Sequence, residues 1–243
     1  MFFYPARMYK RCLCARLTQR VCCERALKRE TVDTKHEIDF LARFICASDA
    51  IEGITDDPKL VRRQLERGAK RGHVGALLYL KDAVSQRTPF AQALVQRTQS
   101  LIVSEQHKKG EREIAPKYRG NWRDCDVWIG GRKGASPAYL PSLMLEWTEK
   151  VVCWQARSAG WGAQENVAQI ARFHFEYEHI HPFVDGNGRS GRALVYYMYR
   201  FADLTPFVFT AGDRHETYYP CFRDPSKMVD YFLGRTVGAP KDR

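Results

Sequence analysis

A short segment in the last third of the chain concentrates residues that could bind phosphate and move a proton. Its glycines permit positive φ and let backbone N–H groups approach a ligand closely. Such donors beside a helix N-terminus and a pair of arginines form an anion site, for which polyphosphate is the natural occupant. A histidine can accept a proton near neutral pH, and one carboxylate suits Mg²⁺ held mainly by phosphates and water. The segment reads His181-Pro182-Phe183-Val184-Asp185-Gly186-Asn187-Gly188-Arg189-Ser190-Gly191-Arg192.

Two predicted helices hold this segment at their ends. Apolar residues follow one stripe from Val167 to Ile180, and the stretch from Arg189 to Leu204 is apolar nearly all round, which is typical of a buried central helix. Because Pro182 cannot continue the first helix, we expect His181 at its C-terminal edge. The second helix then begins with unpaired N–H groups that carry partial positive charge.

Helical spacing recurs through most of the remaining chain. Residues Glu37–Glu52 form an amphipathic pattern that ends at Gly53. The stretch 122–131 indicates instead a strand that runs into a glycine turn, hence a short hairpin. The predicted fold class is mainly α with one β-hairpin, and further helices are expected at about 58–70, 74–87, 89–107 and 140–157, with one or two more within about 214–234.

Composition limits the class of protein. The chain has 243 residues, of which 44% are hydrophobic and 28% charged, and this balance excludes wholesale disorder. No stretch approaches the run of about 20 apolar residues that a membrane span needs, and the N-terminus lacks the apolar core of a signal peptide. Eight cysteines without such a signal indicate thiols in a reducing compartment. We therefore expect a cytoplasmic protein that does not bind membranes.

The net charge of +11 is unevenly distributed. Residues 1–36 carry 9 Lys/Arg and 3 Asp/Glu, residues 59–123 are also strongly basic, and residues 124–243 are balanced. A solvated basic surface is the ordinary explanation, and a nucleic-acid-binding module is the alternative from another functional class. Nucleic acid is not the partner we expect. The cysteines of the extension, at positions 12, 14, 22 and 23, fit zinc spacing poorly.

The segment 181–192 resembles the signature of the Fic family, His-Pro-Phe-x-(Asp/Glu)-Gly-Asn-Gly-Arg-x-x-Arg, at every specified position. The resemblance extends over about residues 37–235 and implies a helical bundle with a short β-hairpin flap beside the active-site loop. We predict one Fic domain over 37–243, after an extension 1–36 of unknown role. Within it we expect an inhibitory helix at 37–53, the flap at about 122–134 and the core motif at 181–192.

The resemblance implies a protein adenylyltransferase that transfers AMP from Mg-ATP to a Ser, Thr or Tyr hydroxyl of a target protein. By motif position, His181 would take the proton of that hydroxyl and Asp185 would hold Mg²⁺. The phosphate and nucleotide contacts would come from Gly186, Asn187, Gly188, Arg189, Arg192, Tyr218 and Tyr219. The flap would pair with an extended target segment through Val127, Trp128, Ile129 and Gly130.

Gly188 separates subfamilies within the resemblance. The related Doc proteins have Lys there and phosphorylate their targets, so glycine favours AMP transfer. The motif does not exclude UTP, GTP or CDP-choline as donors. Relatives often modify themselves and often dimerise, so we expect both by resemblance.

An inhibitory motif of the family, (Ser/Thr)-x-x-x-Glu-(Gly/Asn), is matched by Ser48 to Gly53. By resemblance, Glu52 would pair with Arg192 and occupy the space of the γ-phosphate, and in some relatives the same glutamate serves removal of AMP. An alternative enzyme class is a metal-dependent hydrolase that uses His174, His179, His181 and Asp185. Its spacing is poor, because histidines five residues apart do not share a helix face.

Overall fold

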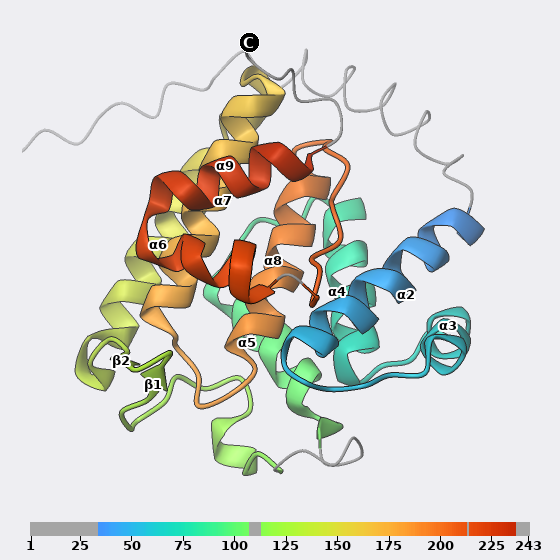
Figure 1. The fold of residues 1–243 in the computed structure, drawn as a ribbon, viewed down its shortest axis with the longest axis horizontal. Coiled ribbons are helices and arrows are strands. Elements are labelled where there is room, and N and C mark those ends of the chain that lie inside the picture. The colour runs from blue at the N-terminus through green and yellow to red at the C-terminus, as the bar shows by residue number, and fades with distance from the viewer. Residues whose placement is uncertain (1–33, 107–112, 213, 237–243) are drawn as a thin grey trace, which may run out of the picture. The chain divides into compact units, whose positions relative to one another are not determined.

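The computed structural model describes residues 34–106, 113–212 and 214–236 (Figure 1). The chain divides into compact units of residues 1–38 and 39–243, and nearly all of the described structure belongs to the second. The expected N-terminal extension, 1–36, lies outside the described residues except for the beginning of the first helix.

The described part of the chain is mainly helical, as predicted, with one small antiparallel sheet. Its long helices are α2 (Thr34–Ile51), α3 (Pro58–Glu66), α4 (Gly72–Ser85), α5 (Gln92–Val103), α6 (Leu140–Gln155), α7 (Ala163–Ile180), α8 (Asn187–Phe201) and α9 (Pro225–Arg235). Short helical turns are η2 (Pro116–Tyr118), η3 (Pro137–Tyr139), η4 (Ser158–Gly160), η5 (Arg214–Tyr218) and η6 (Tyr219–Arg223), and the strands are β1 (Trp128–Ile129) and β2 (Arg132–Lys133).

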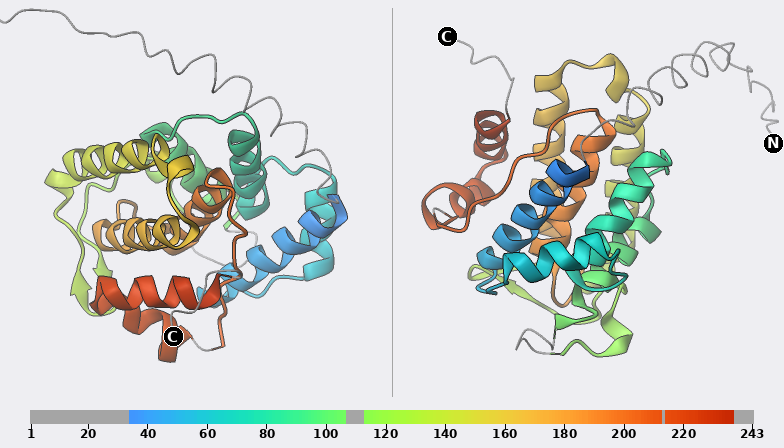
Figure 2. Two further views of the ribbon diagram at one scale, coloured as in Figure 1. Left: turned by 90° about the horizontal axis from the view of Figure 1, so that it is seen from above. Right: turned by 90° about the vertical axis from the view of Figure 1, so that its right-hand side faces the viewer.

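Helix α8 forms the centre of the 39–243 unit. It packs against α4, α5 and α7, and the views in Figure 2 show it enclosed by them. Every side chain from Ala193 to Tyr199 is at most 2% exposed. An apolar sequence all round a helix is stable only when neighbours cover every face, so the predicted central helix is confirmed.

Helix α2 brings its last turn to the start of α8. The Phe44 ring lies on α8 and the chain after it, with its centroid 6.0 Å from that of Tyr196 and 6.2 Å from that of Phe209. The helix ends at Ile51, and Gly53 follows with φ +79°, the left-handed conformation that glycine adopts at helix ends. The predicted end of this helix at Gly53 is therefore confirmed.

The structure gives the extent of two predicted segments. Within 214–234, where one or two helices are expected, the chain forms η5, η6 and α9. Pro225 begins α9, and its N-cap, Asp224, accepts a hydrogen bond from the Ser226 N–H. The hairpin pairs only Trp128 with Lys133 and Ile129 with Arg132, so the strand is shorter than the alternation predicts.

Among the described residues, no helix has the length and apolar character needed to cross a membrane.

Candidate active site

His181 lies at the junction of α7 with the loop that leads to α8. Its backbone adopts φ 51° and ψ 64°, the left-handed conformation, while its N–H still donates to the Tyr177 carbonyl at 2.9 Å. A non-glycine residue in this conformation costs about 1–3 kcal/mol and persists where the surroundings impose it, most often at functional sites. The loop turns at this point, so the imidazole faces the cavity described below.

Arg123 holds the loop in place from the base of the flap, defined as residues 122–134. Its guanidinium is buried and donates to the backbone carbonyls of His181 at 2.8 Å, Cys125 at 2.7 Å and Ala135 at 2.5 Å. Its backbone N–H also donates to the Pro182 carbonyl at 2.9 Å. One side chain thus joins both ends of the flap to the motif. From sequence it is only an arginine preceding a hairpin, and its long-range partners are not evident.

Replacing Arg123 with alanine is expected to lower the free energy of unfolding by about 3 kcal/mol, because a hydrogen bond to a charged group contributes about 1.5–3 kcal/mol and buried carbonyls lose their donor. Urea denaturation followed by circular dichroism measures the change. Arg132→Ala, at an exposed flap position, is the matched control and should change the value little. Equal stability of the two variants would contradict the role assigned to Arg123.

The start of α8 forms an anion cradle. Gly186 is its N-cap with φ +76°, and a side chain there would collide with Val103. The Asn187 amide closes the loop on itself, since its Oδ1 accepts from the Phe183 N–H at 2.9 Å and its Nδ2 donates to the Phe183 carbonyl at 2.8 Å. Asn187 therefore shapes the loop with its side chain and also lines the cavity described below. The first amides of α8 are left to receive an anion.

Asp185 offers its carboxylate on the rim of this cradle. Its Oδ1 accepts from the Gly186 N–H, its Oδ2 accepts from Gln106 Nε2 at 2.8 Å, and the side chain is 39% exposed. Oδ1 also accepts from Arg189 Nη2 at 3.5 Å, whereas Oδ2 has one of its two lone pairs left to bind a cation. The described residues contain no cluster of three metal-ligating side chains. One carboxylate beside a phosphate cradle fits Mg²⁺, which binds through few protein ligands and substrate phosphates.

Arg192 points to the last turn of α2. Its Nε donates to Ser48 Oγ at 2.8 Å, and its Nη2 donates to the Ser48 carbonyl at 3.0 Å and to Glu52 Oε1 at 2.7 Å. Burial raises the pKa of Glu52, but the charge and hydrogen bond of Arg192 outweigh it, so the net pKa is lowered. The predicted residues Ser48, Glu52 and Arg192 thus lie together, and Glu52 and Arg192 form a charged pair at neutral pH.

Glu52 also covers the cradle. A Cβ built on Gly188 would collide with Glu52 Oε1, so a side chain at this position would displace the Glu52 carboxylate. Tyr219 adds a contact from the other side, because its hydroxyl donates to the Ile51 carbonyl at 3.3 Å. The carboxylate lies where an anion bound to Gly188 and Arg192 would need space.

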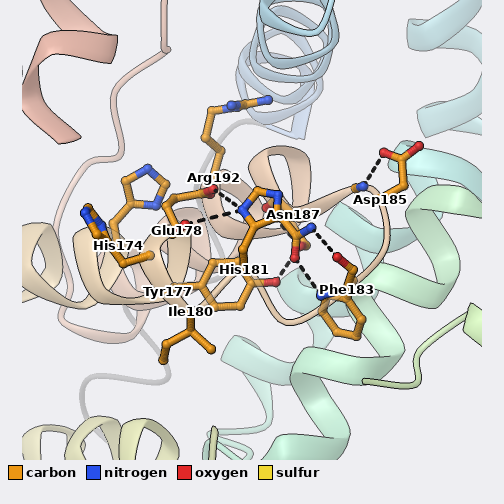
Figure 3. Close-up of polar contacts among 12 residues, drawn as sticks. His174, Tyr177, Glu178, Ile180, His181, Phe183, Asp185, Asn187 and Arg192 are labelled. Carbon is orange, nitrogen blue, oxygen red and sulfur yellow. Dashed lines mark hydrogen bonds and ion pairs between the residues drawn. The ribbon is translucent and has the colours of Figure 1, made fainter. Parts of the chain in front are cut away.

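The His181 ring is uncharged at neutral pH. Burial, together with the positive charge of Arg123, lowers its pKa to about 4 despite the backbone carbonyl of Glu178. Its Nδ1 lies 3.3 Å from that carbonyl, a contact that favours the proton on Nδ1 and leaves Nε2 as the proton acceptor (Figure 3). An uncharged imidazole is the form that a general base requires.

A cavity of about 1050 Å³ joins these groups. Of the residues expected from sequence it takes in Glu52, Trp128, Ile129, Gly130, His181, Asp185, Gly186, Asn187, Gly188, Arg189, Arg192, Tyr218 and Tyr219. Ser48 and Val127 do not line it. His179, expected only for the alternative hydrolase, also lines it. Residues that sequence did not single out as site residues, and that do line it, are Arg132, Glu178, Val184, His215, Pro220, Phe222 and Arg223.

The predicted tyrosine pair divides between two environments. Tyr218 is buried, and its hydroxyl lies 2.7 Å from His174 Nε2. Tyr219 is 38% exposed at the cavity. Burial lowers the pKa of His174 to about 3, and its ring lies among the aromatic residues of α9 and η6. His174 therefore does not join His181 and Asp185, so the alternative hydrolase site is not assembled among the described residues.

Comparison with known proteins gives a consistent result. Residues 90–199 match the family model described as Fic/DOC family. The chain is 29% identical over 129 residues to the protein named "Protein adenylyltransferase Fic" of Drosophila grimshawi, which covers 52% of this chain and 26% of the relative. The Culex quinquefasciatus protein of the same name is 30% identical over 120 residues, covering 47% and 22%. The chain thus spans about a quarter of the length of these curated relatives.

Solved structures share the fold. A Fic-domain-containing signaling protein from Bacteroides thetaiotaomicron superposes with a TM-score of 0.64 at 21% identity, covering 89% of each chain. Fic-1 from C. elegans gives a TM-score of 0.55 at 19% identity, covering 86% of this chain and 62% of the other.

Proposed function

Because residues 90–199 make this chain a member of the Fic/DOC family, we propose that it transfers AMP from ATP to a hydroxyl side chain of a target protein. The observation that carries the proposal is the cavity in which an uncharged His181, the amides of Gly186–Gly188 and the Arg192 guanidinium meet. A proton acceptor next to a phosphate cradle is the arrangement that attack of a hydroxyl on a phosphate requires.

In the proposed reaction, the triphosphate lies on the cradle at the start of α8. His181 Nε2 accepts the proton of the target hydroxyl as its oxygen attacks the α-phosphorus. A bond forms from that oxygen to phosphorus, the bond to the bridging oxygen breaks, and pyrophosphate leaves. Arg189 and Arg192 orient the β- and γ-phosphates and balance their charge. Mg²⁺, held by Asp185 and the phosphates, would supply further neutralisation of charge.

Autoinhibition by Glu52 forms part of the same proposal. Support comes from the short contact to Arg192 and from the position of the carboxylate over Gly188. The Glu52 carboxylate repels the terminal phosphate, and it occupies the Arg192 guanidinium that would otherwise bind that phosphate. The same carboxylate could orient a water for removal of AMP, and this reverse reaction is the second activity we propose for the site.

The target would enter along the flap. Trp128 is 72% exposed at the cavity, and the two short strands leave backbone groups at their edges for an added strand. Val127, Trp128, Ile129 and Gly130 would then present the hydroxyl to His181. Recognition through backbone groups is compatible with self-modification, which we propose together with a homodimer on the strength of the family resemblance.

Intact-mass spectrometry tests the function. The Glu52→Gly variant is incubated with Mg²⁺ and ATP, GTP or UTP in turn, with a lysate fraction as external target. A mass increase of one AMP from ATP, absent in the Glu52→Gly/His181→Ala double variant, is the expected result. A phosphate or another nucleotide as the added group would overturn AMP transfer. No adduct with any donor, combined with salt-dependent binding of DNA that survives loss of His181, would favour the nucleic-acid alternative.

A further inference from the structure

Glu178 is a buried acid whose presence the reaction above does not explain. It lies on α7, one turn before His181, and only 7% of its surface is exposed. Its Oε1 is buried without a hydrogen-bond partner. A carboxyl in such a place costs stability compared with an apolar residue of the same size, so its position needs a reason other than packing.

The fold makes room for this carboxyl. Gly191, in the first turns of α8, faces it, and a Cβ on that glycine would collide with Glu178 Oε1. The same Cβ would lie within 3.2 Å of the His174 ring, so the space between α7 and α8 is filled by the two side chains of α7. Gly191 thus lets a carboxyl lie between the two helices that carry the motif.

The carboxyl lies directly behind the imidazole of His181. Glu178 Oε2 is 3.8 Å from His181 Nδ1, and the backbone carbonyl of the same residue is 3.3 Å from that nitrogen. Figure 3 shows both contacts as dashed lines on one edge of the ring. Glu178 therefore contacts the ring on its Nδ1 side, away from the proton-accepting Nε2.

Charged and titratable groups surround Glu178 on every packed element. On its own helix these are His174, Tyr177 and His181, and across from it are Arg192 of α8, Glu52 after α2 and Tyr218 of η5. Burial raises the pKa of Glu178 to about 8, which the charge of Arg192 opposes and the charge of Glu52 reinforces. The carboxyl is therefore protonated at neutral pH while Glu52 is in place, and loss of Glu52 lowers its pKa.

We propose that Glu178 is a positioning residue that forms a carboxyl–imidazole pair with His181. An ionised carboxylate on the Nδ1 side stabilises the imidazolium that forms when Nε2 takes a proton. No proton needs to pass to Glu178, because the Nδ1–H stays on the ring. The effect on rate rests on the proposed AMP transfer, whereas the pairing itself does not.

Histidine NMR tests the pairing without any substrate. Protein labelled with ¹⁵N in its imidazoles is titrated from pH 5 to 9.5, and the His181 signals are assigned by their loss in His181→Ala. We expect those signals to shift near pH 8 as Glu178 ionises, and at lower pH in Glu52→Gly. This shift should be absent in Glu178→Gln and retained in Glu176→Gln, which removes a surface carboxylate on the same helix. A His181 titration unaltered by Glu178→Gln would overturn the proposal.

Kinetics of the Glu52→Gly variant test the contribution to rate. We expect the turnover rate to rise with pH through one inflection below pH 8, and Glu178→Gln in that background to remove the inflection and lower the plateau about 10- to 100-fold, with the KM for ATP unchanged. A higher KM with unchanged turnover would assign Glu178 to nucleotide binding and overturn the positioning role. If Glu52→Gly transfers no AMP at all, the proposed function fails, while the NMR result still decides the pairing.

Discussion

Replacement of His181 by alanine in the Glu52→Gly background should reduce the turnover rate of AMP transfer by about 10³-fold, since general-base catalysis contributes about 10²–10⁴. Burial holds the imidazole uncharged, so at pH 7 nearly every molecule carries His181 in the form that accepts a proton. Transfer of labelled AMP under single-turnover conditions measures the loss.

The affinity of the His181→Ala variant for Mg-ATP shows whether the substitution affects the chemical step or nucleotide binding. The cradle at Gly186–Gly188 and the arginines of α8 do not depend on the imidazole, so calorimetry should give the same Kd for Mg-ATP within about a factor of two. His181→Ala should also unfold at the same temperature as its parent. A loss of AMP transfer that is explained entirely by weaker ATP binding would remove His181 from the role of base.

Replacement of Glu52 by glycine should raise the turnover rate of AMP transfer about 5- to 150-fold, the usual range for a contact that shifts a two-state equilibrium by 1–3 kcal/mol. The change removes the carboxylate from Arg192 and opens the space over Gly188. It also removes the negative charge that raises the pKa of Glu178. Initial rates at saturating Mg-ATP, for wild type and variant, measure the effect.

The Glu52→Gln variant tests the charge of Glu52 separately from its bulk, because it keeps the side chain over Gly188 and removes only its charge. We expect activation smaller than that of Glu52→Gly. Glu149→Gln, an exposed position on α6, is the matched control for loss of one negative charge and should leave the rate unchanged. If Glu52→Gly is no faster than wild type, the contact with Arg192 is structural and the inhibitory role is wrong.

The pH range of the inhibition follows from the direction in which the pKa of Glu52 is shifted. Its pKa in the folded protein is lowered, so the stabilising contact with Arg192 is complete above the unfolded value of about 4.5 and is lost only as the pH falls through the folded pKa. Wild type should accordingly stay inhibited throughout pH 6–8.

The local sequence was sufficient to predict helices α7 and α8 and the loop between them. The pattern of Val167–Ile180 and the apolar stretch after Arg189 predicted α7 and α8, because helical periodicity and helix-ending residues act within a few positions. Gly186 and Pro182 likewise act through their own backbone, so the cradle could be expected where it lies. Within 214–234, where one or two helices were expected, the last one begins at the local signal Asp224-Pro225.

Local sequence patterns do not predict contacts between residues that lie far apart in the chain. The pairing of Arg192 with Glu52, 140 residues apart, was expected only from resemblance, and its geometry became visible when α2 was seen packed on α8. Arg123 and Glu178 had no local signal, because a charged residue looks the same in sequence whether it is solvated or buried. What the sequence by itself determined was therefore the set of reactive groups in the motif. Only the tertiary structure decided which carbonyls Arg123 binds and which acid lies behind His181, since those contacts depend on how separate helices pack.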